Sequence, residues 1–163
     1  MNGTDLRARV IIDRAELRRA ADGLRAAGKT IVFANGAFDV LHVGHIRFLI
    51  GAAAQGDVLI VGVNTDESIR KYKGPTRPLQ PLVERMEIVA AFRPVAIVTC
   101  FDEPTCDAIL EVIRPHVHAR GPDYTPENLP EYPTLKRLGI RMANVGDPKN
   151  HSSTELIARI RQQ

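Results

Sequence analysis

The sequence contains no tryptophan and only two cysteines, Cys100 and Cys106. These two cysteines do not form a C-x-x-C pair, so they fit a reducing compartment better than a disulfide framework or a zinc site. Five phenylalanines and three tyrosines leave few aromatic platforms on which single-stranded nucleic acid could stack. The formal net charge is only +3, without a basic run. We therefore expect no nucleic-acid partner, although the weak positive charge favours anionic small substrates.

Long hydrophobic runs are also absent. The longest apolar stretches, such as residues 58–63, are far shorter than the roughly 20 residues that span a bilayer. The first seven residues contain no apolar signal core. The sequence therefore predicts a cytoplasmic protein with no membrane partner.

Short apolar runs alternate with helical patterns along the chain. Strands are expected at residues 30–34, 57–63, 95–100, 116–120 and 140–145. Helices are expected at residues 13–27, 42–54, 66–71, 82–92, 103–113, 132–138 and 152–161, with Asp13 as an N-cap and Gly28 as a C-terminal stop. This alternation predicts an α/β fold, a Rossmann-like doubly wound five-stranded parallel sheet with helices on both faces. With 163 residues and 44% hydrophobic residues, one domain over residues 1–163 is expected.

Polar residues follow the predicted strands. They gather at residues 35–45, 64–66, 120–124 and 147–154. In a doubly wound sheet, ligands bind beyond the carboxyl ends of the strands, where the strand order reverses. These four segments are therefore expected to meet at one ligand site.

The most informative stretch is residues 29–49. An apolar run breaks at Asn35-Gly36, and His42-Val43-Gly44-His45 then leads into an Ala- and Leu-rich helical pattern. A strand that enters a helix through a glycine-containing bend presents backbone N–H groups and a positive helix end to an anion. Two imidazoles three residues apart would project to the same side. This pattern indicates a nucleotide site in which positioning and charge stabilisation, without a covalent intermediate, assist exchange of a P–O bond.

Two other interpretations of the histidines remain open. One ring could cap the helix while the other packs against its neighbours, or both could bind a metal ion. No third ligand lies nearby in the sequence, which argues against the metal. The glycines of dinucleotide-binding and P-loop motifs are absent as well.

Residues 33–45, Phe-x-Asn-Gly-x-Phe-Asp-Val-Leu-His-x-Gly-His, resemble the H-x-G-H signature of the nucleotidylyltransferase superfamily. The longer match is similar to the adenylyltransferase domain of heptose-phosphate enzymes, which forms ADP-heptose from heptose 1-phosphate and ATP. The similarity extends to Asn64-Thr65-Asp66, Lys73-Gly74-Pro75-x-Arg77-Pro78, Glu84-Arg85, Gly121-x-Asp123-Tyr124 and Ser152-Ser153-Thr154. It implies an enzyme that uses ATP with Mg²⁺, takes a sugar phosphate as acceptor and forms a homodimer.

The resemblance also implies a role for each matching residue. His42 and His45 would hold the α-phosphate and the leaving pyrophosphate, and Lys73 would meet phosphate from its loop; these three are the expected catalytic residues. The expected nucleotide-binding residues are Asn35, Gly36, Ala37, Phe38, His42, His45, Arg120, Gly121, Asp123, Ser152, Ser153 and Thr154. The expected acceptor-binding residues are Asp39, Asn64, Asp66, Lys73, Arg77 and Arg85. No metal ligand is expected from the protein.

Ordinary structural roles compete with several of these assignments. Asp39 and Asp123 could be turn residues that bond the local backbone, and the arginines and lysine could be solvated cations. Ser152 could be a simple N-cap, with Glu155 completing it.

Two departures from the related sequences bear on specificity. Heptose enzymes usually carry Lys-Gly-Gly-Asp-Tyr where this chain has Arg120-Gly121-Pro122-Asp123-Tyr124, and Pro122 removes a backbone donor. The Arg-Thr-x-Gly-Ile-Ser-Thr of cytidylyltransferases has no counterpart, since Lys149-Asn150-His151 precedes the serines. The alternative enzyme is a polyol-phosphate cytidylyltransferase, such as one for glycerol 3-phosphate. The alternative without turnover is a nucleotide-binding regulatory module.

Overall fold

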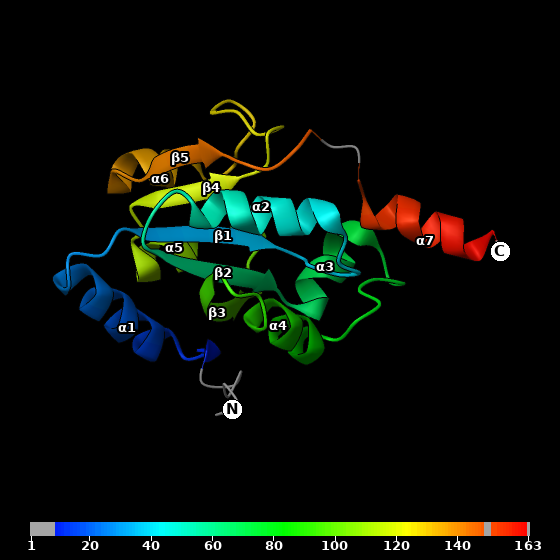
Figure 1. The fold of residues 1–163 in the computed structure, drawn as a ribbon, viewed down its shortest axis with the longest axis horizontal. Coiled ribbons are helices and arrows are strands. Elements are labelled where there is room, and N and C mark those ends of the chain that lie inside the picture. Colours follow the sequence, from blue (N-terminus) through cyan, green and yellow to red (C-terminus); the bar gives the residue numbers. More distant parts are fainter. Residues whose placement is uncertain (1–8, 149–150, 163) are drawn as a thin grey trace.

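The computed structural model describes residues 9–148 and 151–162, so Lys149 and Asn150 lie outside the described residues. Its centre is a five-stranded sheet in the order β3-β2-β1-β4-β5, and every neighbouring pair is parallel. The strands are β1 (Ile31–Gly36), β2 (Val58–Asn64), β3 (Val95–Phe101), β4 (Val117–Arg120) and β5 (Arg141–Asn144) (Figure 1). The predicted Rossmann-like α/β fold is confirmed.

The described residues form seven helices, of which α1 precedes the first strand and the others connect or follow the strands. They are α1 (Arg14–Ala26), α2 (Val43–Ala53), α3 (Asp66–Lys73), α4 (Leu82–Ala90), α5 (Asp107–Ile113), α6 (Tyr132–Leu138) and α7 (Ser153–Arg161). The Asp13 carboxylate caps α1 by accepting from Glu16 N–H at 2.7 Å, and Gly28 follows with φ +72°, as the sequence predicted. No described helix has the length and apolarity needed to cross a membrane.

Helix α5 is shorter than predicted, because it begins at Asp107 rather than at residue 103. The Glu103 carboxylate accepts a hydrogen bond from Asp102 N–H and pairs with Arg14 of α1. These contacts hold the segment in a bend, and Cys106 becomes the N-cap residue.

Alternate residues of each strand pack into two separate cores. Val32 and Ala34 of β1 face the core that contains α2 and α4, whereas Ile31 and Phe33 face the core that contains α1, α5 and α6. Gly62 of β2 makes room for the second core, because a Cβ at this position would lie 2.8 Å from the Phe33 ring. The period-two alternation of a strand therefore decides which face each later polar residue reaches.

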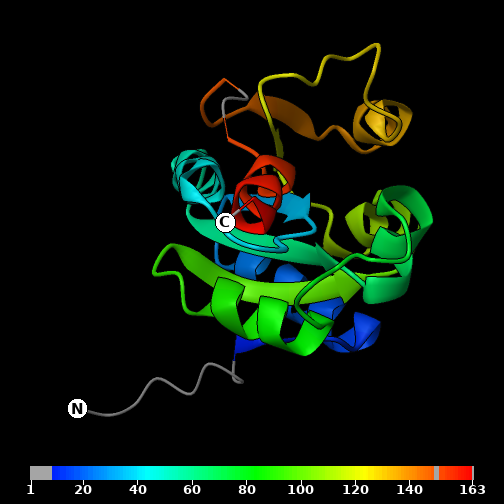
Figure 2. The same ribbon diagram turned by 90° about the vertical axis from the view of Figure 1, so that its right-hand side faces the viewer.

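The strand order reverses at β1, which lies between β2 and β4. Figure 2 looks onto the carboxyl ends of the strands, with α7 in front of the sheet. The loop after β1 and the start of α7 meet here, where the Ser153 hydroxyl donates to the carbonyl oxygens of Asp39 (2.7 Å) and Val40 (3.1 Å). The fold thus brings segments more than 100 residues apart to the crevice that binds ligands in such sheets.

Candidate active site

His42 and His45 lie at the start of α2 with their ring centroids 3.9 Å apart. Nδ1 of His45 accepts a hydrogen bond from the backbone N–H of His42 at 3.2 Å. Because Nδ1 is the acceptor, a neutral His45 carries its proton on Nε2, which is then a donor. The cap contact and the donor therefore use opposite nitrogens of the same ring.

Both imidazoles favour the neutral form. Burial, the neighbouring His42 and the Lys73 cation lower the pKa of His45 to about 4. Burial, His151 and Lys73 also lower the pKa of His42 below its usual value. Near neutral pH each ring is therefore uncharged and has one N–H donor. Because Lys73 lowers the pKa of both rings, its ammonium group acts on both histidines.

Gly44 allows the His42 ring to lie over the first turn of α2. A Cβ at Gly44 would lie 3.0 Å from two atoms of that ring and 3.5 Å from Cβ of His151. Any side chain here would therefore displace the histidine. The glycine of the H-x-G-H pattern is a requirement of this close approach.

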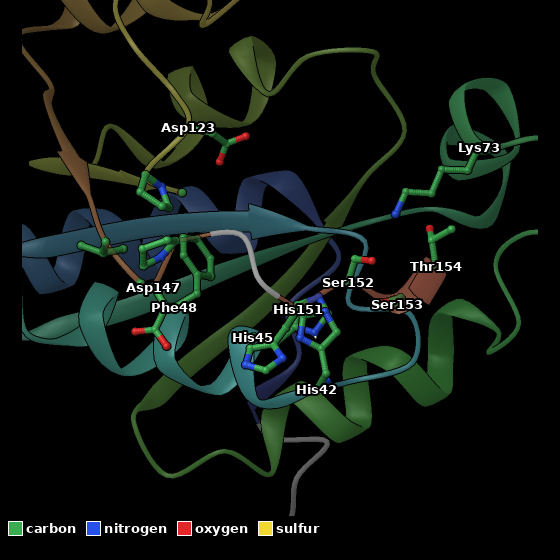
Figure 3. A pocket seen from close by; sticks show the side chains of 16 residues that line it. His42, His45, Phe48, Lys73, Asp123, Asp147, His151, Ser152, Ser153 and Thr154 are labelled. Carbon is green, nitrogen blue, oxygen red and sulfur yellow. Dashed lines mark hydrogen bonds between the residues drawn. The ribbon is translucent and has the colours of Figure 1, made fainter. Parts of the chain in front are cut away.

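A cavity of about 260 Å³ opens beside the two histidines (Figure 3). It is bounded by the start of α2, the end of α3 and the segments that follow β4 and β5. Its lining includes His42, Gly44, His45, Phe48, Lys73, Gly121, Pro122, Asp123, Asp147, His151, Ser152, Ser153 and Thr154. The structure thus brings together the histidines, Lys73, Gly121, Asp123 and the three hydroxyl residues that the sequence assigned to nucleotide and catalysis. We call this the first cavity.

The loop between β1 and α2 is held in an unusual conformation. Phe38 and Val40 have φ values of +48° and +57°, and a positive φ is strained for a β-branched residue. The buried Asp39 carboxylate fixes the loop by accepting from Leu79 N–H, Gln80 N–H and the Arg77 guanidinium. Burial alone would raise the pKa of Asp39, but these donors hold it below its ordinary value.

These bonds give Asp39 and Arg77 a role in positioning the loop, and Arg77 also lines a separate cavity of about 420 Å³ together with Lys73 and Thr154. Asp39 is 1% exposed, and its partner Arg77 lies at 2.6 Å. The Asp39 carboxylate bonds the backbone of Leu79 and Gln80 rather than the local backbone expected of a turn residue, and its role toward the acceptor stays a prediction. Phe38, which the sequence assigned to the nucleotide, is 2% exposed and packs in the core on the α2 side.

Arg85 is directed into the protein interior. Its side chain is fully buried, and it donates to the carbonyl oxygens of Ala37 and Asn64 and to the Asp66 carboxylate at 2.7 Å. The expectation that it meets phosphate finds no support in this geometry, because the guanidinium is used by the protein itself. Arg85 and Asp66 instead tie the ends of β1 and β2 to α3 and α4.

A second cavity, of about 550 Å³, lies on the other side of β1. Its polar lining comes from Asn35, Asn64, Lys73, Arg120 and Glu131, and Gly36 and Ala37 form its edge. Phe48, Lys73 and Gly121 line both cavities, so the two adjoin at these residues.

Asn35 and Arg120, which the sequence placed with the nucleotide, therefore lie in the second cavity and not beside the histidines. Arg120 donates to Asn35 Oδ1 at 2.6 Å and stacks on the Tyr124 ring at 3.9 Å. Asn35 is two residues after Phe33 on β1, and Arg120 is two residues after His118 on β4, so each pair points to the same face of the sheet. The Phe33 and His118 rings stack on that face, 5.5 Å apart. The alternation of strand faces thus directs them away from α2.

Cys106 and Glu131, on the wall of the second cavity, form a buried group with His118 that no sequence motif indicated. Their sulfur, nitrogen and oxygen atoms lie within 4.8 Å of one another. His118 Nε2 lies 3.1 Å from Asn35 Oδ1, and Arg120 Nε lies 3.8 Å from the Glu131 carboxylate. The one feature of the sequence that could have linked part of this group to the site is the spacing of His118 and Arg120, which lie two residues apart and therefore share a face of β4.

His118 should make the stability of the fold sensitive to acid. Burial and the Arg120 cation lower its pKa to about 3 from 6.5, so protonation favours the unfolded chain as the pH falls below about 6.5. Between pH 6 and pH 4, the free energy of unfolding should fall by about 1.4 kcal/mol per pH unit from this residue. In His118→Phe that contribution should vanish, as measured by urea unfolding at pH 7, 6 and 5. Equal slopes below pH 6 in variant and wild type would contradict this account; above pH 7.5 the two slopes should agree.

Comparison with known proteins finds a family match over most of the chain. A family model described as cytidylyltransferase-like matches residues 33–159. The chain is 39% identical over 155 residues to "Bifunctional protein HldE" of Alcanivorax borkumensis, covering 95% of this chain and 33% of that protein. It is 41% identical over 147 residues to the protein of the same name from Syntrophotalea carbinolica, covering 90% of this chain and 30% of that protein. The chain thus spans about a third of the curated relatives it matches.

A solved structure supports the fold. The lipopolysaccharide core biosynthesis protein from Thermoplasma volcanium superposes with a TM-score of 0.63 and 22% sequence identity. The match covers 75% of this chain and all of that one. At this identity, the likeness concerns the arrangement of the backbone.

Proposed function

This chain belongs to the cytidylyltransferase-like family, and from that premise we propose that it transfers AMP from ATP to heptose 1-phosphate or a close analogue, releasing pyrophosphate and forming ADP-heptose. The observation that carries the proposal is that His42 and His45 line the first cavity while Lys73 lines both cavities and stands where they adjoin. A nucleotide in the first cavity and a sugar phosphate in the second would meet at these residues.

The reaction is an in-line displacement at phosphorus. A phosphate oxygen of the acceptor attacks the α-phosphorus of ATP, and the bond from the α-phosphorus to the bridging oxygen breaks. The neutral His45 donates from Nε2 to the oxygens that gain charge, and His42 helps to hold the α-phosphate and the leaving pyrophosphate. Lys73, at the end of α3, places its ammonium charge at the shared border, where it attracts the acceptor phosphate.

The remaining residues of the first cavity suit the other parts of ATP. Asp123 follows Gly121 beyond β4, where a carboxylate can accept from ribose hydroxyls. The start of α7, with Ser152 and Thr154, offers hydroxyls and a helix N-terminus to the β- and γ-phosphates. Ser152 also caps α7 by accepting from Glu155 N–H at 3.1 Å, so the cap and a phosphate contact share one segment.

Mg²⁺ forms part of this proposal. The first cavity offers the hard carboxylate oxygens of Asp123 and Asp147, and Asp147 is paired with Arg47. Because the protein offers only these few oxygens, the ion would be held largely by triphosphate oxygens and water. When bound, Mg²⁺ would neutralise charge on the departing pyrophosphate.

A homodimer also belongs to the proposal. Helix α7 extends beyond the sheet and exposes Leu156 and Ile160, and Val83 of α4 is exposed as well (Figure 1). These apolar side chains are suited to contact with a second copy of the chain.

The activity is tested by pyrophosphate release with ATP or CTP against heptose 1-phosphate and glycerol 3-phosphate. We expect turnover with ATP and heptose 1-phosphate that is lost with EDTA and restored by Mg²⁺. Turnover only with CTP and glycerol 3-phosphate would replace this proposal with a polyol-phosphate cytidylyltransferase. Nucleotide binding without pyrophosphate from any acceptor would indicate a regulatory module.

Lys73→Ala is expected to raise KM for the acceptor at least tenfold and to change KM for ATP much less, because the cation at the shared border then no longer attracts the acceptor phosphate. Initial rates at varied acceptor concentration measure this effect. Lys71→Ala is a matched control on the same helix, since Lys71 pairs with Glu67 and Asp102 and lines neither cavity. An unchanged acceptor KM in Lys73→Ala would remove Lys73 from the site.

A further inference from the structure

Glu131 is a buried carboxylate on the wall of the second cavity. It is the N-cap residue of α6 and is 3% exposed. The Cys106 thiol donates to its Oε1 at 3.1 Å, and Arg120 Nε lies 3.8 Å from the same oxygen. Its position is therefore fixed from two sides by groups of the protein.

The thiol acts as a permanent donor to this carboxylate. Burial and the negative charge of Glu131 raise the pKa of Cys106, so the sulfur keeps its proton. Behind it, His118 and Arg120 both contact Asn35 Oδ1, at 3.1 Å and 2.6 Å. Through Arg120, which contacts both Asn35 and Glu131, these three residues form one connected polar wall.

This wall has unused accepting capacity. A carboxylate can accept about four hydrogen bonds, whereas among the described residues the Cys106 thiol is the donor that lies within 3.5 Å of the Glu131 carboxylate. Arg120, at 3.8 Å, contributes charge rather than a hydrogen bond. A ligand in the second cavity would find fixed acceptor positions, which suit hydroxyl groups.

The rest of the cavity fits the same kind of ligand. Tyr72, Phe101 and Tyr124 supply apolar ring surfaces, and Asn64 and Thr105 supply further polar atoms. Alternating hydroxyls and C–H faces are the features of a sugar. Lys73 lines both cavities while Glu131 lines only the second, so a bound acceptor would direct its phosphate toward Lys73 and its hydroxyls toward Glu131.

We propose that Glu131 accepts hydrogen bonds from hydroxyl groups of the acceptor, and that it thereby selects a polyhydroxylated sugar phosphate over a short polyol phosphate. This inference rests on the proposed function, because it names the acceptor side of the same reaction. Glu131 is a specificity-determining residue in this account. It acts on substrate choice and not on the phosphorus centre.

A metal ion held by Cys106, His118 and Glu131 is the competing explanation for the same group. The Arg120 cation, with Nε 3.8 Å from the Glu131 carboxylate, opposes a second cation at the same group. We therefore favour the sugar, and metal content is included in the test.

The test compares Glu131→Gln with Glu127→Gln, a matched control on the same segment whose side chain is exposed and outside both cavities. Initial rates are measured with ATP and heptose 1-phosphate, with singly deoxygenated analogues of that sugar, and with glycerol 3-phosphate. In Glu131→Gln, KM for heptose 1-phosphate should rise at least tenfold while KM for ATP stays within twofold. In Glu127→Gln, both values should match wild type.

The deoxy analogues test the inference in the unaltered protein. Wild type should disfavour at least one analogue by tenfold or more in kcat/KM, and Glu131→Gln should lose that discrimination. Equal kcat/KM for all analogues in wild type would overturn the inference even if the variant failed to fold, and so would one equivalent of zinc in the purified chain that is lost in Cys106→Ala. Absence of turnover by wild type with every acceptor would instead refute the proposed function.

Discussion

Replacing His45 with alanine is expected to lower kcat by two to three orders of magnitude and to leave the Kd of ATP within a few fold. In the proposed reaction the lost group is a neutral Nε2–H donor to the α-phosphate, and removing one such fixed donor costs about 3–4 kcal/mol of transition-state stabilisation. Ground-state binding changes less, because the helix start and the rest of the first cavity still hold the nucleotide. Pyrophosphate release gives kcat, and equilibrium titration gives the Kd.

His45→Asn separates the two functions of this ring. Nδ1 of His45 accepts from the His42 N–H, and the amide oxygen of asparagine can replace Nδ1 in that cap. Asparagine does not reach the position of Nε2, so the variant should be as slow as His45→Ala while retaining the stability of wild type. A fully active His45→Asn would show that the cap alone mattered. Activity within threefold of wild type in His45→Ala would reject the catalytic role.

Periodicity was sufficient to predict the order and type of the elements. The apolar runs of β1 and β2 are buried on both faces, and Asp13 and Gly28 bound α1 in ways that depend only on local chemistry. The H-x-G-H stretch was also local: its two histidines and Gly44 lie within four residues at the start of α2, so their proximity follows from the local geometry of the helix start.

The partners of single charged residues were not predictable in the same way. Arg120 follows β4, and its sequence position indicates only that it lies at the ligand edge of the sheet. Strand parity, together with Asn35 on the neighbouring strand, directs it into the second cavity. Glu131 and Cys106 are 25 residues apart and meet only because α5 and α6 pack on the same face. Such contacts depend on tertiary packing, and the periodicity of a single sequence does not indicate which residues will meet.

Arg85 provides the sharpest contrast between sequence and structure. Arg85→Met is expected to lower the free energy of unfolding by roughly 3–5 kcal/mol, the range for removing one partner of a buried ion pair. The change leaves the carbonyl oxygens of Ala37, Asn64 and Gln80 without this donor, and it frees the Asp66 carboxylate. Urea unfolding at pH 7 measures the loss.

Arg93→Met is the matched control, since Arg93 is exposed shortly after the same helix and should change stability by less than about 0.5 kcal/mol. The two interpretations of Arg85 then separate cleanly. If Arg85 bound the phosphate of the acceptor, Arg85→Met would be stable and its KM for the acceptor would rise. If Arg85 makes only buried structural bonds, the variant would be unstable, and its folded fraction would keep the KM of wild type. A stable Arg85→Met with impaired acceptor binding would restore the expectation from sequence. The structure predicts the reverse, because the Arg85 guanidinium is fully buried, bonds only groups of the protein and lines neither cavity.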